Sequence, residues 1–285
     1  MPLVPDITAF FDDATNSVSY LVADPATKVA AIIDPVLDFD VASGKIETSS
    51  AARILAAAGD KGLTVAFVLE THAHADHLSA ASLIRERSGA KIGVGSGIVK
   101  VQETFGPLLK VSDLSRSDFD RLFEDGDEIA LGELTIKVLA TPGHTPACVT
   151  YCVGDAAFIG DTLFMPDYGT ARCDFPGGNA RQLYRSIQRI LSLPQETRLF
   201  MCHDYKAPGR DVFAWETTVG EQREQNVHLA GGVSEGDYVA MREGRDATLK
   251  APKLLYPAIQ VNMRGGRLPP ADGAGRRYLN IPLTL

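Results

Sequence analysis

The hydrophobic and polar positions near the start of the chain predict a pair of β-strands. Residues 17–22 alternate between polar and apolar side chains, as in a strand whose two faces differ. Residues 28–34 form a more continuous apolar run that Pro35 closes, which is typical of a fully buried strand. The Asp-Pro turn at 24–25 lies between them, so we expect a hairpin that feeds a larger sheet.

Strand-like and helix-like patterns then follow one another along the rest of the chain. A buried strand is expected at 63–69, a helix at 49–58 between a Ser N-cap and Gly59, and a helix at 78–88 that ends at Gly89. Further strands are expected at 91–94, 123–130, 132–139, 148–153, 156–160 and 198–201, with helices at 179–191, 216–229 and near 238–241. This order in two halves predicts two sheets with helices on their outer faces.

Composition and charge argue against several classes of protein. Of the 285 residues, 45% are hydrophobic and 22% are charged, which is too apolar for a disordered chain. The net charge of −8 disfavours nucleic-acid binding. No stretch approaches the roughly 20 apolar residues of a membrane span. The first residues carry neither a basic nor an apolar leader, so we expect a cytoplasmic protein.

The cysteine positions indicate reduced thiols. Cysteines stand at 148, 152, 173 and 202, with no Cys-x-x-Cys pair and no disulfide-dense pattern. Cys148 and Cys152 fall in the strand expected at 148–153 and would share one of its faces, where a thiol packs as a small hydrophobic group.

Candidate metal ligands cluster directly after predicted strands. They are His72, His74, Asp76, His77, His144, Asp161 and His203, and they include five of the six histidines. Alternate residues of an extended segment point the same way, so His72, His74 and Asp76 can face one pocket, which His77 can reach from the start of the next helix. Side by side without a metal, such polar groups would be costly to desolvate. Imidazole and carboxylate ligands suit Zn, Fe or Mn, so the sequence predicts a metal site. His228, the remaining histidine, is expected on a helix surface or at an interface.

These segments together resemble the metallo-β-lactamase superfamily. The motifs are Thr-His-Ala-His-Ala-Asp-His at 71–77, Pro-Gly-His-Thr at 142–145, Gly-Asp at 160–161 and His-Asp-Tyr at 203–205. The resemblance implies an α/β fold, an αββα sandwich of two mixed β-sheets flanked by helices, with the metal at the sheet edges. It does not imply a substrate.

A second set of segments is similar to the persulfide dioxygenases of mitochondria and bacteria, and most of all to the bacterial β-lactamase-hydrolase-like branch. These segments are 141–151, 171–175, 203–205, 221–226 and 261–264. With them the resemblance covers nearly the whole chain. We therefore expect a single domain over 1–285, with 206–285 as a C-terminal extension packed on it.

The resemblance implies an enzyme that binds one Fe(II) per chain through His72, His144 and Asp161. His74, Asp76, His77 and His203 would then orient these ligands or form an unfilled second site. The implied reaction oxidises glutathione persulfide, or the persulfide of a related small thiol, with O₂ to sulfite and thiol in sulfide detoxification. The alternative is a dinuclear zinc thioester hydrolase of the glyoxalase II kind, in which a metal-bound hydroxide attacks an acyl carbon. The oligomeric state is left open, with a homodimer as one expectation.

Three residues are expected to contact the substrate. Arg172 can grip a carboxylate of glutathione with two hydrogen bonds, and the hydroxyl of Tyr205 can point into the cavity. Cys173 replaces a Thr of the dioxygenase pattern, and an exposed thiol in an electropositive setting there would be activated as a sulfur acceptor. Residues 206–210 also differ from that pattern, which leaves the thiol carrier open, and 39–48 are expected as an insertion near the active face.

Overall fold

The alternating and continuous apolar segments form two six-stranded sheets in the computed structural model, which describes residues 4–283. The first sheet has the order β1 (Asp6–Asp12), β2 (Ser17–Ala23), β3 (Val29–Ile33), β7 (Thr64–Glu70), β9 (Lys91–Gly95) and β10 (Arg121–Phe123). The second has the order β11 (Glu128–Leu131), β12 (Leu134–Ala140), β13 (Val149–Val153), β14 (Ala156–Phe158), β15 (Arg198–Phe200) and β16 (Glu216–Thr218). Both sheets mix parallel and antiparallel pairs.

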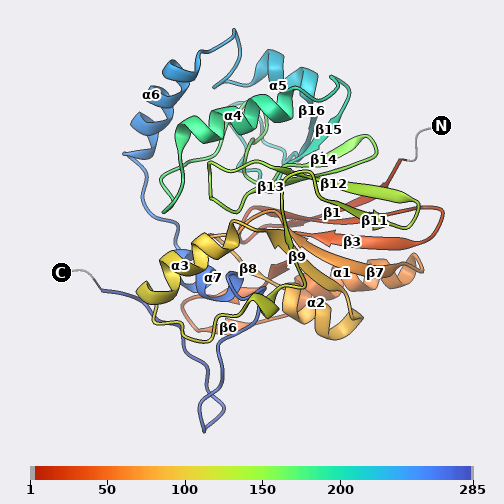
Figure 1. Ribbon diagram of the computed structural model, residues 1–285, viewed down its shortest axis with the longest axis vertical. Coiled ribbons are helices and arrows are strands. Elements are labelled where there is room, and N and C mark those ends of the chain that lie inside the picture. The colour runs from red at the N-terminus through yellow and green to blue at the C-terminus, as the bar shows by residue number, and fades with distance from the viewer. Residues whose placement is uncertain (1–3, 284–285) are drawn as a thin grey trace.

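Helices cover the outer face of each sheet (Figure 1). The first sheet packs against α1 (Ser49–Asp60), α2 (Ala81–Ser88), α3 (Ile98–Leu108) and α7 (Leu255–Asn262). The second packs against α4 (Ala180–Leu191), α5 (Val219–Gln225) and α6 (Glu235–Asp246). The αββα sandwich expected from the resemblance is therefore confirmed.

The apolar core has three layers because the central strands are buried on both faces. On β2, Val18, Tyr20 and Val22 pack between the two sheets, whereas Leu21 and Ala23 pack toward the helices. The alternation at 17–22 therefore separates two buried environments, and it does not separate core from solvent.

The segment after residue 206 contacts both halves of the sandwich. Helix α6 packs against α4, and α7 packs against α3 and the short strand β8 (Leu78–Ser79). β8 pairs with β4 (Val36–Leu37). β5 (Phe39–Asp40) and β6 (Lys45–Ile46) form a small hairpin within the stretch expected as an insertion.

Several expected boundaries were wrong. The helix expected at 78–88 begins only at Ala81, because Leu78 and Ser79 pair with β4. The helix expected at 216–229 starts as β16 and is helical only over Val219–Gln225. Helix α6 is longer than the helix expected near 238–241, and Cys148 lies just before β13. β1, α3 and α7 were not expected at all.

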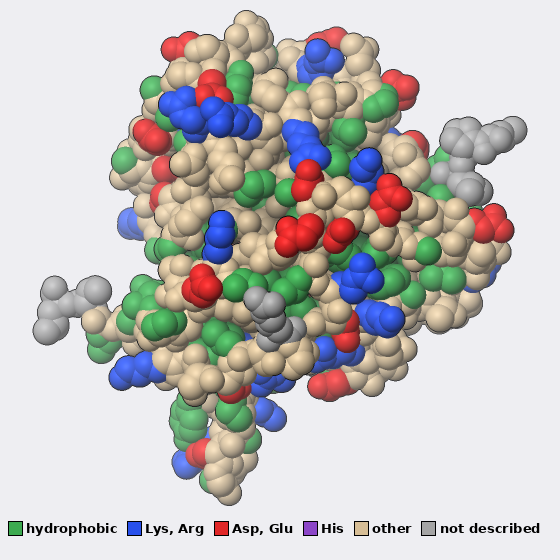
Figure 2. All heavy atoms as spheres, viewed as in Figure 1, with side chains coloured by type: hydrophobic (Ala, Val, Ile, Leu, Met, Phe, Trp, Pro, Cys, Tyr) green, Lys and Arg blue, Asp and Glu red, His purple; other side chains and the backbone are tan. Residues whose placement is uncertain are grey.

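Charge and hydropathy can also be followed on the folded chain. On the face shown in Figure 2, acidic and basic side chains are interspersed, without a broad basic patch. Among the described residues, no helix is both long and apolar enough to cross a membrane.

Candidate metal centre

Four segments bring the candidate ligands to one edge where the two sheets meet. His72, His74, Asp76 and His77 lie in the loop after β7, His144 follows β12, Asp161 follows β14 and His203 follows β15. Each segment comes directly after the C-terminal end of a strand. Backbone hydrogen bonds from Val18 to Cys202 and from Val149 to Thr71 connect the strand ends here, so the ligands share one rigid frame.

Two glycines allow the ligand loops to approach their neighbours closely. Gly143 has a φ of 141°, and a Cβ there would lie 2.3 Å from the Cα atom of Leu183 on α4. Gly160 has a φ of 52°, and a Cβ there would lie 2.7 Å from Oγ1 of Thr71. A side chain at either position would combine backbone strain with a clash. Glycine is therefore needed directly before both His144 and Asp161.

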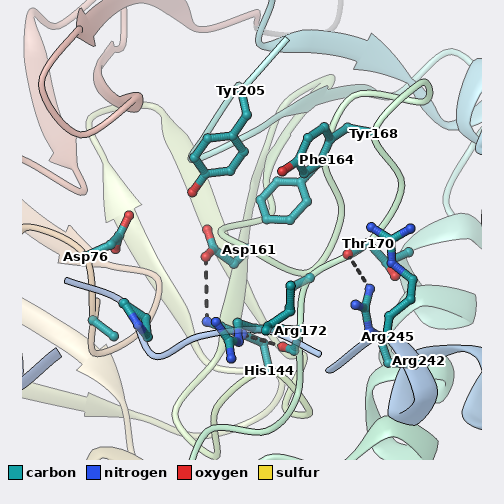
Figure 3. A pocket seen from close by; sticks show the side chains of 14 residues that line it. Asp76, His144, Asp161, Phe164, Tyr168, Thr170, Arg172, Tyr205, Arg242 and Arg245 are labelled. Carbon is teal, nitrogen blue, oxygen red and sulfur yellow. Dashed lines mark hydrogen bonds and ion pairs between the residues drawn. The ribbon is translucent and has the colours of Figure 1, made fainter. Parts of the chain in front are cut away.

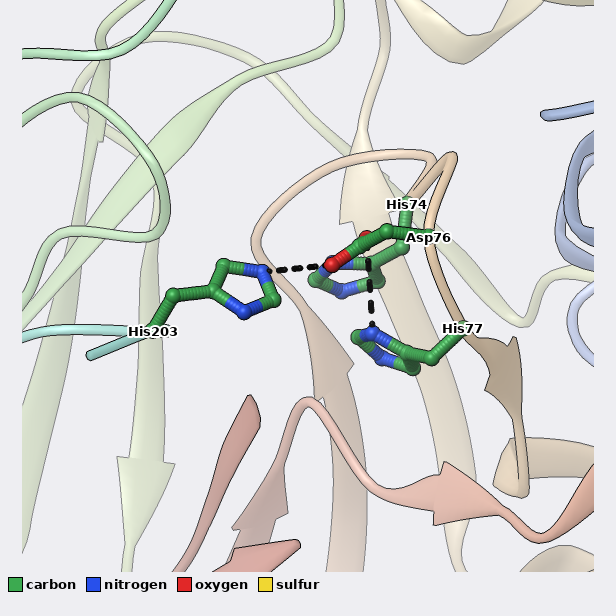
Figure 4. Close-up of side chains that lie close together, drawn as sticks. All are labelled: His74, Asp76, His77 and His203. Carbon is green, nitrogen blue, oxygen red and sulfur yellow. Dashed lines mark ion pairs between the residues drawn. The ribbon is translucent and has the colours of Figure 1, made fainter. Parts of the chain in front are cut away.

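The ligand atoms form two adjoining groups. The first group is His72, His144 and Asp161, and the second is His74, Asp76, His77 and His203 (Figure 4). Within each group the ligand atoms lie within 4.8 Å of one another. Asp161 lies between the groups: its Oδ2 is 3.6 Å from Nε2 of His144, and its Oδ1 is 3.4 Å from Nε2 of His203. All seven predicted residues are thus brought together.

The ligand atoms have the properties that a bound cation requires. Five of them are buried without a hydrogen-bond partner among the described residues: His72 Nε2, Asp76 Oδ2, His77 Nε2, Asp161 Oδ1 and His203 Nε2. A buried polar atom without a partner costs about 1–3 kcal/mol, so five at one place would be strongly unfavourable. A metal ion would satisfy them together, and the nitrogen and oxygen ligands suit a divalent transition metal.

Hydrogen bonds behind the first group fix which nitrogen of each imidazole faces the metal. The Thr71 hydroxyl donates to Oδ2 of Asp34 at 2.8 Å, so it accepts from Nδ1 of His72 at 3.0 Å. Nδ1 of His144 donates to the carbonyl oxygen of Arg172 at 2.6 Å. Both Nε2 atoms therefore keep a free lone pair. Burial lowers the pKa of His72 well below its ordinary value, and His74 and His144 lower it further, which favours the neutral, ligating form.

Asp34 and Glu70 are buried site residues that the sequence reasoning missed. Oδ1 of Asp34 lies 3.0 Å from Nε2 of His74, and Oε2 of Glu70 lies 3.2 Å from the same nitrogen. Asp34 follows β3 and Glu70 ends β7, and these strands are parallel neighbours. An acidic residue at the end of each buried apolar run was the available signal. Together the two carboxylates engage Nε2 of His74.

A cavity of about 320 Å³ opens in front of the first group (Figure 3). His144, Asp161 and Asp76 line its inner end, and Phe164, Tyr168 and Tyr205 form an aromatic wall. The Tyr205 ring stacks on the ring of His203, with 5.5 Å between the ring centres. Tyr205 thus lines the cavity and also packs on a candidate ligand. The β5–β6 hairpin does not line this cavity and borders a separate pocket beside His77.

The side chain of Arg172 lines the cavity but is held by partners within the protein. Its Nε and Nη2 atoms donate to the two carboxylate oxygens of Asp174, each at 2.6 Å, and Nη1 donates to the carbonyl oxygen of Lys250 at 2.8 Å. The pair of hydrogen bonds expected for a substrate carboxylate is therefore made to Asp174 in this structure.

The structure does not provide the setting that would activate Cys173. Its thiol is buried and lies 3.2 Å from Oδ2 of Asp246, and it does not line the cavity. Burial, together with the Asp246 carboxylate, raises the pKa of Cys173 to about 12. The condition for an activated thiol, exposure in an electropositive setting, is not met, because the thiol is buried and the nearest charge is negative.

His228 holds the cavity wall and is not a free surface histidine. Its Nδ1 accepts from the backbone N–H of Thr170 at 3.0 Å. The Tyr238 hydroxyl donates to Oγ1 of Thr170 at 2.9 Å, and Nη1 of Arg242 donates to its carbonyl oxygen at 3.0 Å. The amide, hydroxyl and carbonyl of Thr170 are therefore all bound by the C-terminal part of the chain. We call this arrangement the Thr170 clamp.

Comparisons with known proteins agree with this fold and site. The chain is 51% identical to a probable metallo-hydrolase of Burkholderia pseudomallei over 97% of its length and 98% of the relative. It is 53% identical to a β-lactamase hydrolase-like protein of Xylella fastidiosa, but it spans only 65% of that longer protein. It is also 43% identical to Glyoxylase B2 of Dictyostelium discoideum, over 93% of this chain and 92% of the relative.

Two further matches concern persulfide chemistry and the fold. The chain is 31% identical to the human mitochondrial persulfide dioxygenase ETHE1, over 90% of this chain and 87% of that protein. The crystal structure of ETHE1 from Myxococcus xanthus superposes with a TM-score of 0.74 at 33% identity, covering 92% of this chain and 100% of that one. The profile of the metallo-β-lactamase superfamily matches residues 12–203, which include every candidate ligand. The chain belongs to the metallo-β-lactamase superfamily.

Proposed function

We propose that the protein is a non-haem Fe(II) dioxygenase that oxidises glutathione persulfide, or the persulfide of a related small thiol, with O₂ to sulfite and thiol. One observation carries the proposal: His72, His144 and Asp161 form a ligand group of their own, and His144 and Asp161 line the cavity. Two imidazoles and one carboxylate on one side of an ion are the ligand set typical of non-haem Fe(II) oxygenases. The likeness to persulfide dioxygenases supports the same conclusion.

Iron in this group would supply the redox chemistry that joins O₂ to the terminal sulfur of the persulfide. The residues of the chain would do the remaining work. Thr71 and the Arg172 carbonyl hold the two imidazoles in their ligating form, and the aromatic wall around Tyr205 keeps water from one side of the cavity. We also propose that the reaction serves sulfide detoxification in the cytoplasm, where the four unpaired cysteines would stay reduced.

The contacts of His74 favour the iron dioxygenase over a hydrolase with two metals. A second imidazole from the loop after β7 could join His72 and His144 around one ion, but Nε2 of His74 contacts Asp34 and Glu70, and its ligand atom groups with Asp76 and His77. The first group is thereby left with three protein ligands and open positions for substrate and O₂.

A dinuclear zinc thioester hydrolase is the second candidate. Asp161 lies between the two ligand groups, as a ligand shared by two ions would, and the relative named Glyoxylase B2 is 43% identical. Such an enzyme would use a metal-activated hydroxide and would need no O₂.

Measurement of two reactions on the same protein separates the candidates. The iron-loaded chain should consume O₂ and release sulfite when glutathione persulfide is added, and the zinc-loaded chain should do neither. His144→Ala should abolish both O₂ consumption and iron binding. Hydrolysis of S-lactoylglutathione by the zinc-loaded chain, with no O₂ consumption by the iron-loaded chain, would refute the proposal.

A further inference from the structure

Three arginines line the cavity, and two of them lie at the end away from Asp76. Arg172, Arg242 and Arg245 all line it, and Figure 3 shows Arg242 and Arg245 on the side opposite Asp76. The inner end carries carboxylates and imidazoles, so the cavity has a metal-binding end and a cationic end. The protein as a whole carries a net charge of −8, so an anionic substrate depends on local cations of this kind.

Two of these arginines are already neutralised by partners in the protein. Arg172 is paired with Asp174, as described above. Arg242 is buried and pairs with Asp246, with 2.7 Å between its Nη2 and Oδ1, and it also binds the Thr170 carbonyl. Both guanidinium groups therefore build the wall and have few donors left for a ligand.

Arg245 differs from both. It is exposed, it lines the same cavity, and within residues 4–283 its side chain makes no ion pair or hydrogen bond. The buried ion pair between Arg242 and Asp246 anchors the last turn of α6, and this turn carries Arg245. Its charge also reaches the Thr170 clamp: burial, together with the charges of Arg242 and Arg245, lowers the pKa of His228 to about 4.

We propose that Arg245 binds a carboxylate of the substrate, and thereby selects persulfides whose carrier thiol bears a carboxylate remote from the sulfur. The inference rests on the proposed function for the sulfur end of the substrate, but the anion site depends only on the cavity and α6. A guanidinium without a protein partner can make two hydrogen bonds to a carboxylate. Leu249 and Pro252 line the same cavity and offer apolar contacts for the middle of such a molecule. A cavity of about 320 Å³ favours a small peptide-like thiol over a nucleotide-bearing one.

The test measures binding, so that it does not depend on turnover. The ligand is S-methylglutathione, which keeps both carboxylates, titrated into the iron-loaded chain by calorimetry. Arg245→Ala should weaken binding about tenfold, as expected for loss of a charged hydrogen bond, and Arg245→Lys should retain most of it. Arg223→Ala is the matched control, because it removes the same charge from α5 outside the cavity. The diethyl ester, which lacks the carboxylates, should bind wild type and Arg245→Ala equally.

Each outcome bears on the inference. Binding of S-methylglutathione by Arg245→Ala within twofold of wild type would overturn it, as would an equal loss in Arg223→Ala. If Arg245→Ala bound S-methyl-coenzyme A more weakly than wild type but bound S-methylglutathione equally well, the site would be a phosphate site and the carboxylate assignment would be overturned. If the iron-loaded chain consumes no O₂ with glutathione persulfide while the dependence on Arg245 persists, the proposed function fails and the anion site stands.

Discussion

Nδ1 of His144 lies 2.6 Å from the backbone carbonyl oxygen of Arg172, so a loop of the cavity wall fixes the orientation of a candidate metal ligand. Thr71 does the same for His72 through its hydroxyl. The Arg172 carbonyl is adjacent in sequence to the Thr170 clamp. The C-terminal part of the chain therefore supports both the shape of the cavity and the metal centre behind it.

Removal of the Thr71 hydroxyl should weaken metal binding. In Thr71→Val, Nδ1 of His72 loses its acceptor and the ring is no longer held in its ligating form, so iron affinity should fall about 10- to 100-fold. Competition with a chelator measures this affinity. Thr71→Ser keeps the hydroxyl and should stay close to wild type. Equal affinities for Thr71→Val and wild type would mean that the hydrogen bond does not orient His72.

Breaking the buried ion pair of α6 should destabilise the protein strongly. Arg242→Ala leaves Asp246 buried without its cationic partner and frees the Thr170 carbonyl. A broken buried pair costs about 3–5 kcal/mol, and the free energy of unfolding from urea titration should fall by about this amount. Tyr238→Phe removes a single hydroxyl from the same clamp and should cost about 1 kcal/mol. A loss for Arg242→Ala no larger than that for Tyr238→Phe would contradict the role of the pair.

Cys173 should be chemically inert. Because its thiol pKa is raised to about 12, almost none of it is thiolate at pH 8, and iodoacetamide should label it far more slowly than a free cysteine. Cys173→Ser can still donate a hydrogen bond to Asp246, so its persulfide oxidation rate should stay within about twofold of wild type. Rapid labelling of Cys173 in the folded protein, followed by mass spectrometry, would contradict this picture.

His228 should make the stability of the protein depend on pH. Its pKa is about 4 in the folded protein and 6.5 ordinarily, so the unfolded chain binds the proton more readily. The stabilisation is therefore complete above pH 6.5 and is lost as the pH falls toward 4. His228→Asn offers an acceptor at the position of Nδ1 but does not titrate, so its melting temperature should fall less between pH 6.5 and 4. Identical slopes for the two proteins would rule out this contribution.

The sequence was most informative where chemistry and local pattern coincide. The four ligands at 72–77 follow a buried apolar run within six residues, so both the strand and the site could be predicted from one short segment. His144, Asp161 and His203 were predicted from strand ends in the same way, and the structure brings all seven together. The family resemblance also implied how these ligands divide into two groups. The contacts of Asp34 and Glu70 with His74 were missed, because they depend on which strands are neighbours, and the sequence did not reveal that.

Two of the elements that were not predicted, helix α7 and strand β1, lack a strong local pattern of hydrophobic and polar residues. Helix α7 contains Pro257 and two β-branched residues, and it forms because it packs between α3 and β8. Strand β1 is half-buried at the sheet edge and shows no clear alternation of burial. His228 and Cys173 were misjudged for a related reason. Their partners, Thr170 and Asp246, are 58 and 73 residues away in the sequence, so their surroundings arise only from the tertiary fold.

The metal content of the chain purified without oxygen tests the central claim most directly. We expect one iron per chain, lost in Asp161→Ala, because His72, His144 and Asp161 form a ligand group of their own. Elemental analysis by mass spectrometry, normalised to protein concentration, gives the metal and its stoichiometry together. Two zinc ions per chain, with no iron, would contradict the account and indicate the dinuclear hydrolase.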